Sequence, residues 1–120
     1  MKKLFIRVVV CFFLSISFVH AAFVEGLEDI PLAEGLTQIE NESLNFGNEE
    51  SRLIEAYFKS DTSNFNSITD FYKNTLPQMG WKLQKQTASA VVFEREGEIL
   101  DIRIESKNPL KVRLTVKSKN

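Results

Sequence analysis

Residues 90–117 read AVVFEREGEILDIRIESKNPLKVRLTVK, and apolar and polar side chains alternate along most of this stretch. The alternation is cleanest over residues 100–104 and 110–116, and a period of two is the pattern of a strand with one buried face. Glu96-Gly97 and residues 107–109 are typical of tight turns between antiparallel strands. The stretch therefore predicts a three-stranded antiparallel meander with one polar face, with strands over 90–95, 98–105 and 110–116.

A helix is expected just before this meander, because apolar residues recur there at three- and four-residue steps. The apolar stripe comprises Phe65, Ile68, Tyr72, Leu76 and Met79. The helix should run from about Asn66 to Leu76, where Pro77 ends it, and Ser67 and Asp70 have the spacing of a capping box. Gly80 suits the chain reversal that follows.

Three more strands are expected, over 44–46, 52–58 and 81–83, and the first two can form a hairpin. Together these patterns predict an α+β fold: an antiparallel β-sheet of four to six strands with one helix packed on its apolar face. The helix should cover that face, because nothing else in the chain can.

Residues 43–120 are expected to form a single α+β domain, preceded by an irregular acidic segment over 22–42. Ile30, Leu32 and Leu36 could anchor that segment to the domain. The motif PLAEGL at 31–36 is interpreted as a staple that covers a sheet edge, with a docking segment for a partner as the alternative.

Residues 1–21 have the pattern of a cleavable secretory signal peptide. Lys2, Lys3 and Arg7 precede an apolar run, and Val19-His20-Ala21 favours cleavage before Ala22. The protein is therefore expected to be exported to a bacterial periplasm. The alternative is an inner-membrane anchor formed by uncleaved residues 4–24, which are just long enough to span a bilayer.

Removing the signal peptide changes the chemistry available to the chain. Cys11 and His20, the only cysteine and histidine, lie within it. Three of the fifteen bases and none of the sixteen acids also lie there, so twelve bases and sixteen acids remain, a net charge of −4. Disulfides, cysteine or histidine catalysis and the usual zinc, copper and haem ligands are excluded, and no metal or cofactor is expected. Nucleic acid is not an expected partner of an acidic exported chain.

Charge is distributed unevenly along the sequence. Residues 22–55 hold nine acids and one base, whereas residues 106–120 hold five bases and no acid. Lys111, Arg113 and Lys117 should share one strand face and could contact an acidic protein partner or, weakly, an anionic membrane surface. Lysine decoration of a solvent-exposed face is the plainer interpretation. We also expect part of the acidic segment 25–42 to lie near the basic strand.

Aromatic residues around the helix are a second candidate surface. Tyr72 and Trp81 are best explained as core residues, because a small domain needs large side chains to fill its interior. Phe71 lies at the shoulder of the helical stripe and could contact a ligand or partner.

Four carboxylates crowd one predicted hairpin: Glu94, Glu96, Glu98 and Asp101. They could form an acid–base pair for hydrolysis. No loop has the ligand spacing of a calcium site. Cross-strand pairing with bases such as Arg95 and Arg103 on a solvated face is the simpler explanation.

Several motifs resemble a group of small exported proteins of alphaproteobacterial type. These motifs are PLAEGL at 31–36, SRLIEAYF at 51–58, FYKNTLPQMGW at 71–81, FEREGEILDI at 93–102 and VRLTV at 112–116. The resemblance covers most of the chain after residue 21 and implies no catalytic residues. A looser likeness, in fold only, is to the helix-grip domains of envelope assembly lipoproteins.

We therefore expect a small non-enzymatic envelope protein that binds a protein partner or assists assembly. The alternative is a small carboxylate-based hydrolase that uses the hairpin acids.

Overall fold

The computed structural model describes residues 23–47 and 51–119. The expected signal peptide and its cleavage site lie outside these residues. Most of the alternative anchor, residues 4–22, also lies outside them. The elements run in the order β1 (Phe23–Val24), β2 (Leu27–Pro31), β3 (Thr37–Gln38), η1 (Glu40–Glu42), β4 (Leu44–Gly47), β5 (Arg52–Ser60), α2 (Phe65–Thr75), η2 (Leu76–Met79), β6 (Lys82–Gln86), β7 (Ala90–Arg95), β8 (Glu98–Lys107) and β9 (Leu110–Ser118).

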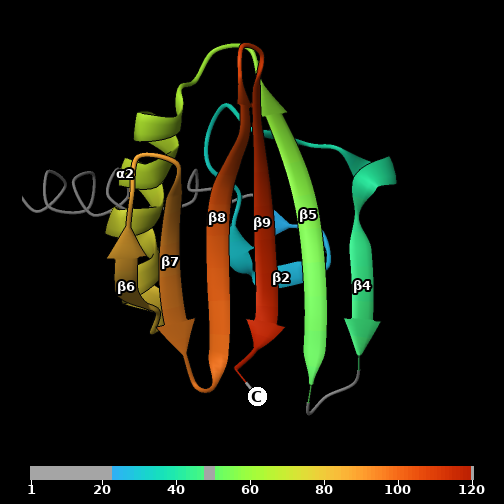
Figure 1. Ribbon diagram of the computed structural model, residues 1–120, viewed down its shortest axis with the longest axis vertical. Coiled ribbons are helices and arrows are strands. Elements are labelled where there is room, and N and C mark those ends of the chain that lie inside the picture. The colour runs from blue at the N-terminus through green and yellow to red at the C-terminus, as the bar shows by residue number, and fades with distance from the viewer. Residues whose placement is uncertain (1–22, 48–50, 120) are drawn as a thin grey trace, which may run out of the picture.

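The fold is α+β, as predicted, with one large antiparallel sheet and a separate two-stranded sheet formed by β1 and β2 (Figure 1). The large sheet has the order β3-β5-β9-β8-β7-β6, and β4 also pairs with β5. Its seven strands exceed the expected four to six because β3 and β4 pair with different parts of β5. The short 3₁₀ helix η1 lies between them in the chain.

The meander predicted over residues 90–117 is confirmed as β7, β8 and β9. Val91 pairs with Ile102, which pairs with Leu114, and all three side chains are buried on the inner face of the sheet. The register shifts between Ile104 and Ser106, which is the signature of a bulge at this point of β8. β9 pairs with β5 on one side and with β8 on the other, so it lies at the centre of the sheet.

Two elements cover the inner face, not one. In Figure 1, α2 lies behind β6 and β7, whereas β2 lies behind β8, β9 and β5. The expectation that only the helix could cover this face is wrong. The N-terminal segment expected to be irregular contains strands and contributes five buried apolar side chains: Val24, Leu27, Ile30, Ala33 and Leu36.

The helix lies close to its predicted bounds, but its cap differs from the prediction. Asn64 is the N-cap, and its Oδ1 accepts a hydrogen bond from the Ser67 backbone N–H at 2.9 Å. The predicted box of Ser67 and Asp70 is wrong, because the helix begins one turn earlier than that box requires. The 3₁₀ helix η2 continues from α2 and ends at Gly80, which adopts a left-handed φ of 91°. The Gly80 N–H donates to carbonyl groups of the last turn of η2.

Tyr72 joins the helix to the N-terminal segment. Its hydroxyl donates to the Pro31 carbonyl at 2.8 Å and accepts from the Ala33 N–H at 3.3 Å, and both bonds are buried. Burial raises the pKa of Tyr72, because the phenolate would lose its hydration there. The apolar stripe of the helix is thus part of the core, as the sequence predicted. The hydroxyl of Tyr72 has a further role, because it bonds the helix to the N-terminal segment.

Arg95 holds together the end of the molecule near the β7–β8 turn. Its guanidinium lies 4.3 Å from the centre of the Trp81 ring, donates to the Met79 carbonyl at 3.1 Å and pairs with Asp29. Trp81 is only 1% exposed, which confirms it as a core residue. Arg95 therefore bonds to β2 and η2 while it closes the edge of the core.

Candidate interaction surfaces

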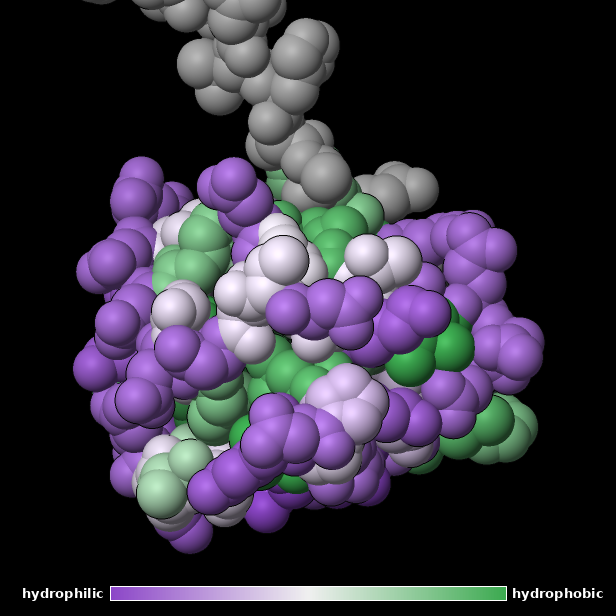
Figure 2. Space-filling view, turned by 90° about the horizontal axis from the view of Figure 1, so that it is seen from above, coloured by the Kyte–Doolittle hydropathy of each residue, from purple (hydrophilic) through white to green (hydrophobic). Residues whose placement is uncertain are grey.

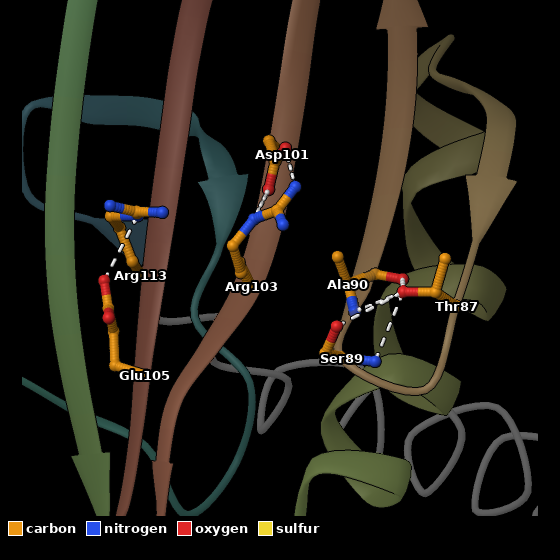
Figure 3. Close-up of polar contacts among 7 residues, drawn as sticks. All are labelled: Thr87, Ser89, Ala90, Asp101, Arg103, Glu105 and Arg113. Carbon is orange, nitrogen blue, oxygen red and sulfur yellow. Dashed lines mark hydrogen bonds and ion pairs between the residues drawn. The ribbon is translucent and has the colours of Figure 1, made fainter.

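The basic residues of β9 lie on the outer face of the sheet, but two of the three are in ion pairs. Lys111 Nζ lies 2.9 Å from Glu42 Oε1 and 5.3 Å from the centre of the Tyr57 ring. Arg113 Nε lies 3.2 Å from Glu105 Oε1 (Figure 3). Lys117 is exposed, and no ion pair reaches it among the residues described. The local charge available to an acidic partner or an anionic membrane is therefore smaller than the sequence alone indicates.

The expected proximity of segment 25–42 to β9 is confirmed at one end of the segment. Glu42, in η1, reaches Lys111 across the strand pair formed by β5 and β9. Residues 27–36 instead pack beneath the sheet, on the face opposite to Lys111, as the burial of Ile30 and Ala33 shows. Leu32 is partly buried against the same core. PLAEGL is thus a staple, and most of it covers the inner face rather than an edge.

Phe71 belongs to the same packing. It is half-buried, meets the Tyr72 ring edge-on with centroids 5.0 Å apart, and packs against the core. It also lines a surface hollow of about 550 Å³ together with Ala33 and Gly35. Its exposed part is therefore the rim of the contact between the helix and the N-terminal segment.

Three of the four hairpin carboxylates have basic partners, and of the two expected bases only Arg103 is among these partners. Glu94 pairs with Lys119 at 2.8 Å, and Glu98 pairs with Arg52. The pKa of Arg52 is raised by its hydrogen bond to the Glu98 carboxylate.

Asp101 accepts two hydrogen bonds from Arg103 on the same strand (Figure 3). Glu96 occupies the β7–β8 turn with a φ of 47°. Glu94 and Glu96 both line an open depression of about 450 Å³, together with Lys82 and Arg95. The hydrolase alternative stays a prediction, and in the described residues no group of three or more acids has the arrangement of a metal site.

The two edges of the large sheet differ in chemistry, which sequence reasoning missed. β6 carries Lys82 and Lys85, the kind of residue that discourages strands from adding to an edge. β4, with the sequence LNFG, has no charge and pairs only with β5 in the described part of the chain. Leu44 and Phe46 are 38% and 58% exposed. The sequence did contain a sign of this apolar edge: residues 44–46 alternate apolar and polar side chains and none of them is charged.

A small hollow lies beside β4 on the inner side of the sheet. Its volume is about 210 Å³, and its lining includes Glu25, Gln38, Glu40 and Asn45. The Gln38 side chain fixes one wall, because its amide exchanges hydrogen bonds with the backbone N–H and carbonyl of Glu25 at 2.9 and 3.3 Å. No basic residue is part of this lining.

A further groove of about 450 Å³ lies between the start of α2 and the β8–β9 hairpin. Phe65, Ile104 and Leu110 supply apolar surface, and Lys107 is part of the lining. Figure 2 views this end of the molecule and shows apolar residues between hydrophilic ones. Phe65 and Leu110 are themselves buried in the core, so much of this apolar surface already serves the fold.

Within residues 23–47 and 51–119, no helix has the length and apolar character needed to cross a bilayer. Comparison with known proteins finds no family model, no curated protein and no solved structure that matches this chain.

Proposed function

We propose that this protein is a small non-enzymatic module of the bacterial cell envelope that binds a protein partner along β4. The observation that carries the proposal is the outer edge of β4, which no other strand of the described residues covers, and which exposes Leu44 and Phe46 and bears no charge. Strand edges of this kind accept an extended segment of another protein, whose backbone adds hydrogen bonds and whose side chains bury the exposed apolar groups.

The contrast with the opposite edge supports this assignment. Both β4 and β6 are edge strands, and each exposes a leucine, but β6 also exposes two lysines and two glutamines, whereas β4 exposes Phe46 and carries no charge. An apolar edge is an aggregation hazard unless something covers it. A protein partner that pairs with β4 would remove the hazard and bury Phe46.

Export is the second part of the proposal and rests on the signal-peptide pattern of residues 1–21 and on the resemblance to small exported proteins. The protein purified from the periplasm should begin at Ala22 and carry no lipid, which intact mass measures. A mass that retains residues 1–21 would instead support the membrane anchor.

Partner binding is tested by photo-crosslinking in living cells. A photoreactive phenylalanine analogue at position 46 should give a discrete adduct, and the same analogue at Leu83, on β6, should not. The crosslinked protein, once identified and purified, should bind the wild-type chain and lose binding to Phe46→Lys. Adducts of equal yield from both positions, or unchanged binding by Phe46→Lys, would overturn the assignment to β4.

A further inference from the structure

We propose that the segment bound at β4 carries a lysine or arginine, and that this side chain enters the hollow lined by Glu25 and Glu40. The inference rests on the proposed binding at β4 and specifies the chemistry of the partner. It follows from the register of the edge, the position of the hollow and the charges around it.

The register decides which partner residue faces the hollow. Leu44 and Phe46 pair with Glu55 and Leu53 and lie on the outer side of the sheet, whereas Asn45 pairs with the buried Ile54. Asn45 therefore lies on the inner side, because successive side chains of a strand point to opposite faces. In an added strand, the residue opposite Asn45 points inward, and its two neighbours point outward toward Leu44 and Phe46.

The hollow lies where that inward residue would point. Asn45 and Leu44 line it on the β4 side, and Glu25 lines it from the β1–β2 turn. A volume of about 210 Å³ suits one side chain and not a folded element. The hydrogen bonds between Gln38 and Glu25 hold the two walls together, so the hollow is present before a partner arrives.

The charges around the hollow favour a basic side chain. In the described residues, no ion pair engages the carboxylates of Glu25 or Glu40, whereas the neighbouring Glu42 pairs with Lys111. Opposite charge across an interface contributes specificity and speeds association more than it adds raw affinity. The acidic lining should therefore select among extended segments that pair with β4 equally well.

A second copy of this chain fits the site less well. Antiparallel pairing of two β4 strands about Asn45 places an uncharged amide, not a base, opposite each hollow. Charge complementarity thus favours a basic partner segment over self-association.

Three peptides that differ at one position test the inference against the chain that starts at Ala22. The probes are acetylated, amidated Ser-Thr-Val-Lys-Val-Thr-Ser and the same peptide with glutamine or glutamate at the centre. Binding is followed by NMR titration of the backbone amides at low salt. The lysine peptide should shift the β4 amides and bind about tenfold more tightly than the glutamate peptide, as expected for two partly exposed charge pairs. Physiological salt should reduce that preference.

Two charge-neutralising variants show where the preference arises. Glu25→Gln combined with Glu40→Gln should reduce the difference between lysine and glutamate peptides to about twofold or less. Glu34→Gln combined with Glu96→Gln changes the net charge equally at remote exposed sites and should leave the preference intact. A preference that survives the first pair, or disappears in the second, would overturn the role of the hollow.

The outcomes separate this inference from the function on which it rests. Equal binding of all three peptides at β4, abolished by Phe46→Lys, would overturn the basic-residue preference and leave edge binding in place. If no peptide shifts the β4 amides, both the preference and the proposed edge binding fail.

Discussion

Replacing Tyr72 with phenylalanine removes one oxygen atom from the contact between the helix and the N-terminal segment. The ring can remain in place, because the substitution deletes only the hydroxyl. Two buried backbone groups lose their partner: the Pro31 carbonyl, which accepts the hydroxyl proton, and the Ala33 N–H, which donates to it. Water cannot easily replace the hydroxyl, since Tyr72 and Ala33 are each about 1% exposed.

The expected cost follows from these two bonds. A buried group that loses its hydrogen-bond partner costs about 1–3 kcal/mol, and the 3.3 Å bond is the weaker of the two. We expect Tyr72→Phe to lower the free energy of unfolding by about 2–3 kcal/mol. For a domain of this size that corresponds to a fall in Tm of roughly 10–20 °C. It is also a large part of the total stability, which is typically about 5–15 kcal/mol.

The chain supplies its own control, because its only other tyrosine lies on the outer face. Tyr57 is half-buried, and its hydroxyl lies 3.5 Å from Glu55 Oε1. Tyr57→Phe should change stability by less than about 0.5 kcal/mol, as is usual for surface substitutions. Urea titration and thermal unfolding of both variants give the comparison.

Hydrogen exchange locates the effect. In Tyr72→Phe, amides of residues 23–36 should lose protection more than amides at the centre of the sheet, because the removed bonds hold that segment. A loss of stability no larger than that of Tyr57→Phe would refute the assignment of Tyr72 as the link to the N-terminal segment. Uniform loss of protection throughout the chain would refute the local nature of the link.

Further predictions concern the same core and the basic strip. Because the folded pKa of Tyr72 lies above its usual value of about 10, the stability from its buried neutral form is complete below about pH 10 and is lost as pH rises further. The advantage of wild type over Tyr72→Phe should therefore shrink by about 1.4 kcal/mol per pH unit above pH 10, measured by urea unfolding. Trp81→Ala should cost about 3–5 kcal/mol, and a loss below about 1 kcal/mol would place the indole outside the core. Arg95→Lys should lower stability by about 1–2 kcal/mol in thermal unfolding, because lysine cannot both stack on the indole and keep two directed hydrogen bonds; an unchanged Tm would contradict this. A double-mutant cycle of Lys111→Gln and Glu42→Gln should give a coupling below about 1 kcal/mol that 0.5 M salt removes, and a larger salt-resistant coupling would mean that the pair is effectively buried.

Local periodicity was sufficient for the elements whose neighbours in sequence are also neighbours in space. The alternation of residues 98–105 and the stripe from Phe65 to Leu76 predicted β8 and α2 close to their observed bounds. The N-cap was misplaced by one turn, because the spacing of Ser67 and Asp70 suggested a capping box, whereas Asn64 caps the helix and the buried Phe65 begins it.

The N-terminal segment could not be predicted from periodicity, for a physical reason. Apart from Pro31, its buried residues recur every three positions from Val24 to Leu36, which fits neither a strand nor a helix well. Gly26 and Gly35, with φ of 89° and 90°, redirect the chain so that successive apolar residues meet the same core.

The ion pairs between residues far apart in the chain were equally inaccessible to sequence reasoning. Asp29 and Arg95 are 66 residues apart, and no local pattern connects them. The same holds for Arg52 and Glu98, which meet only because β9 brings β5 and β8 together. Of the two bases expected to pair with the hairpin acids, Arg103 bonds to Asp101 on its own strand, whereas Arg95 pairs with the distant Asp29.

Because β9 lies at the centre of the sheet but follows its neighbours in the sequence, the sheet cannot be completed until β9 has been made. Residues 110–118 follow both β5 and β8 in the chain, yet β9 is the strand that pairs with both of them and joins them into one sheet. A growing chain that lacks β9 can form the β7–β8 hairpin and local helix, but it has two halves of a sheet with no strand to join them. Such contacts between distant residues also slow folding, because the chain loses entropy before the contacts form. For a protein that we propose is exported, this topology leaves the two halves of the sheet unjoined until β9 is available.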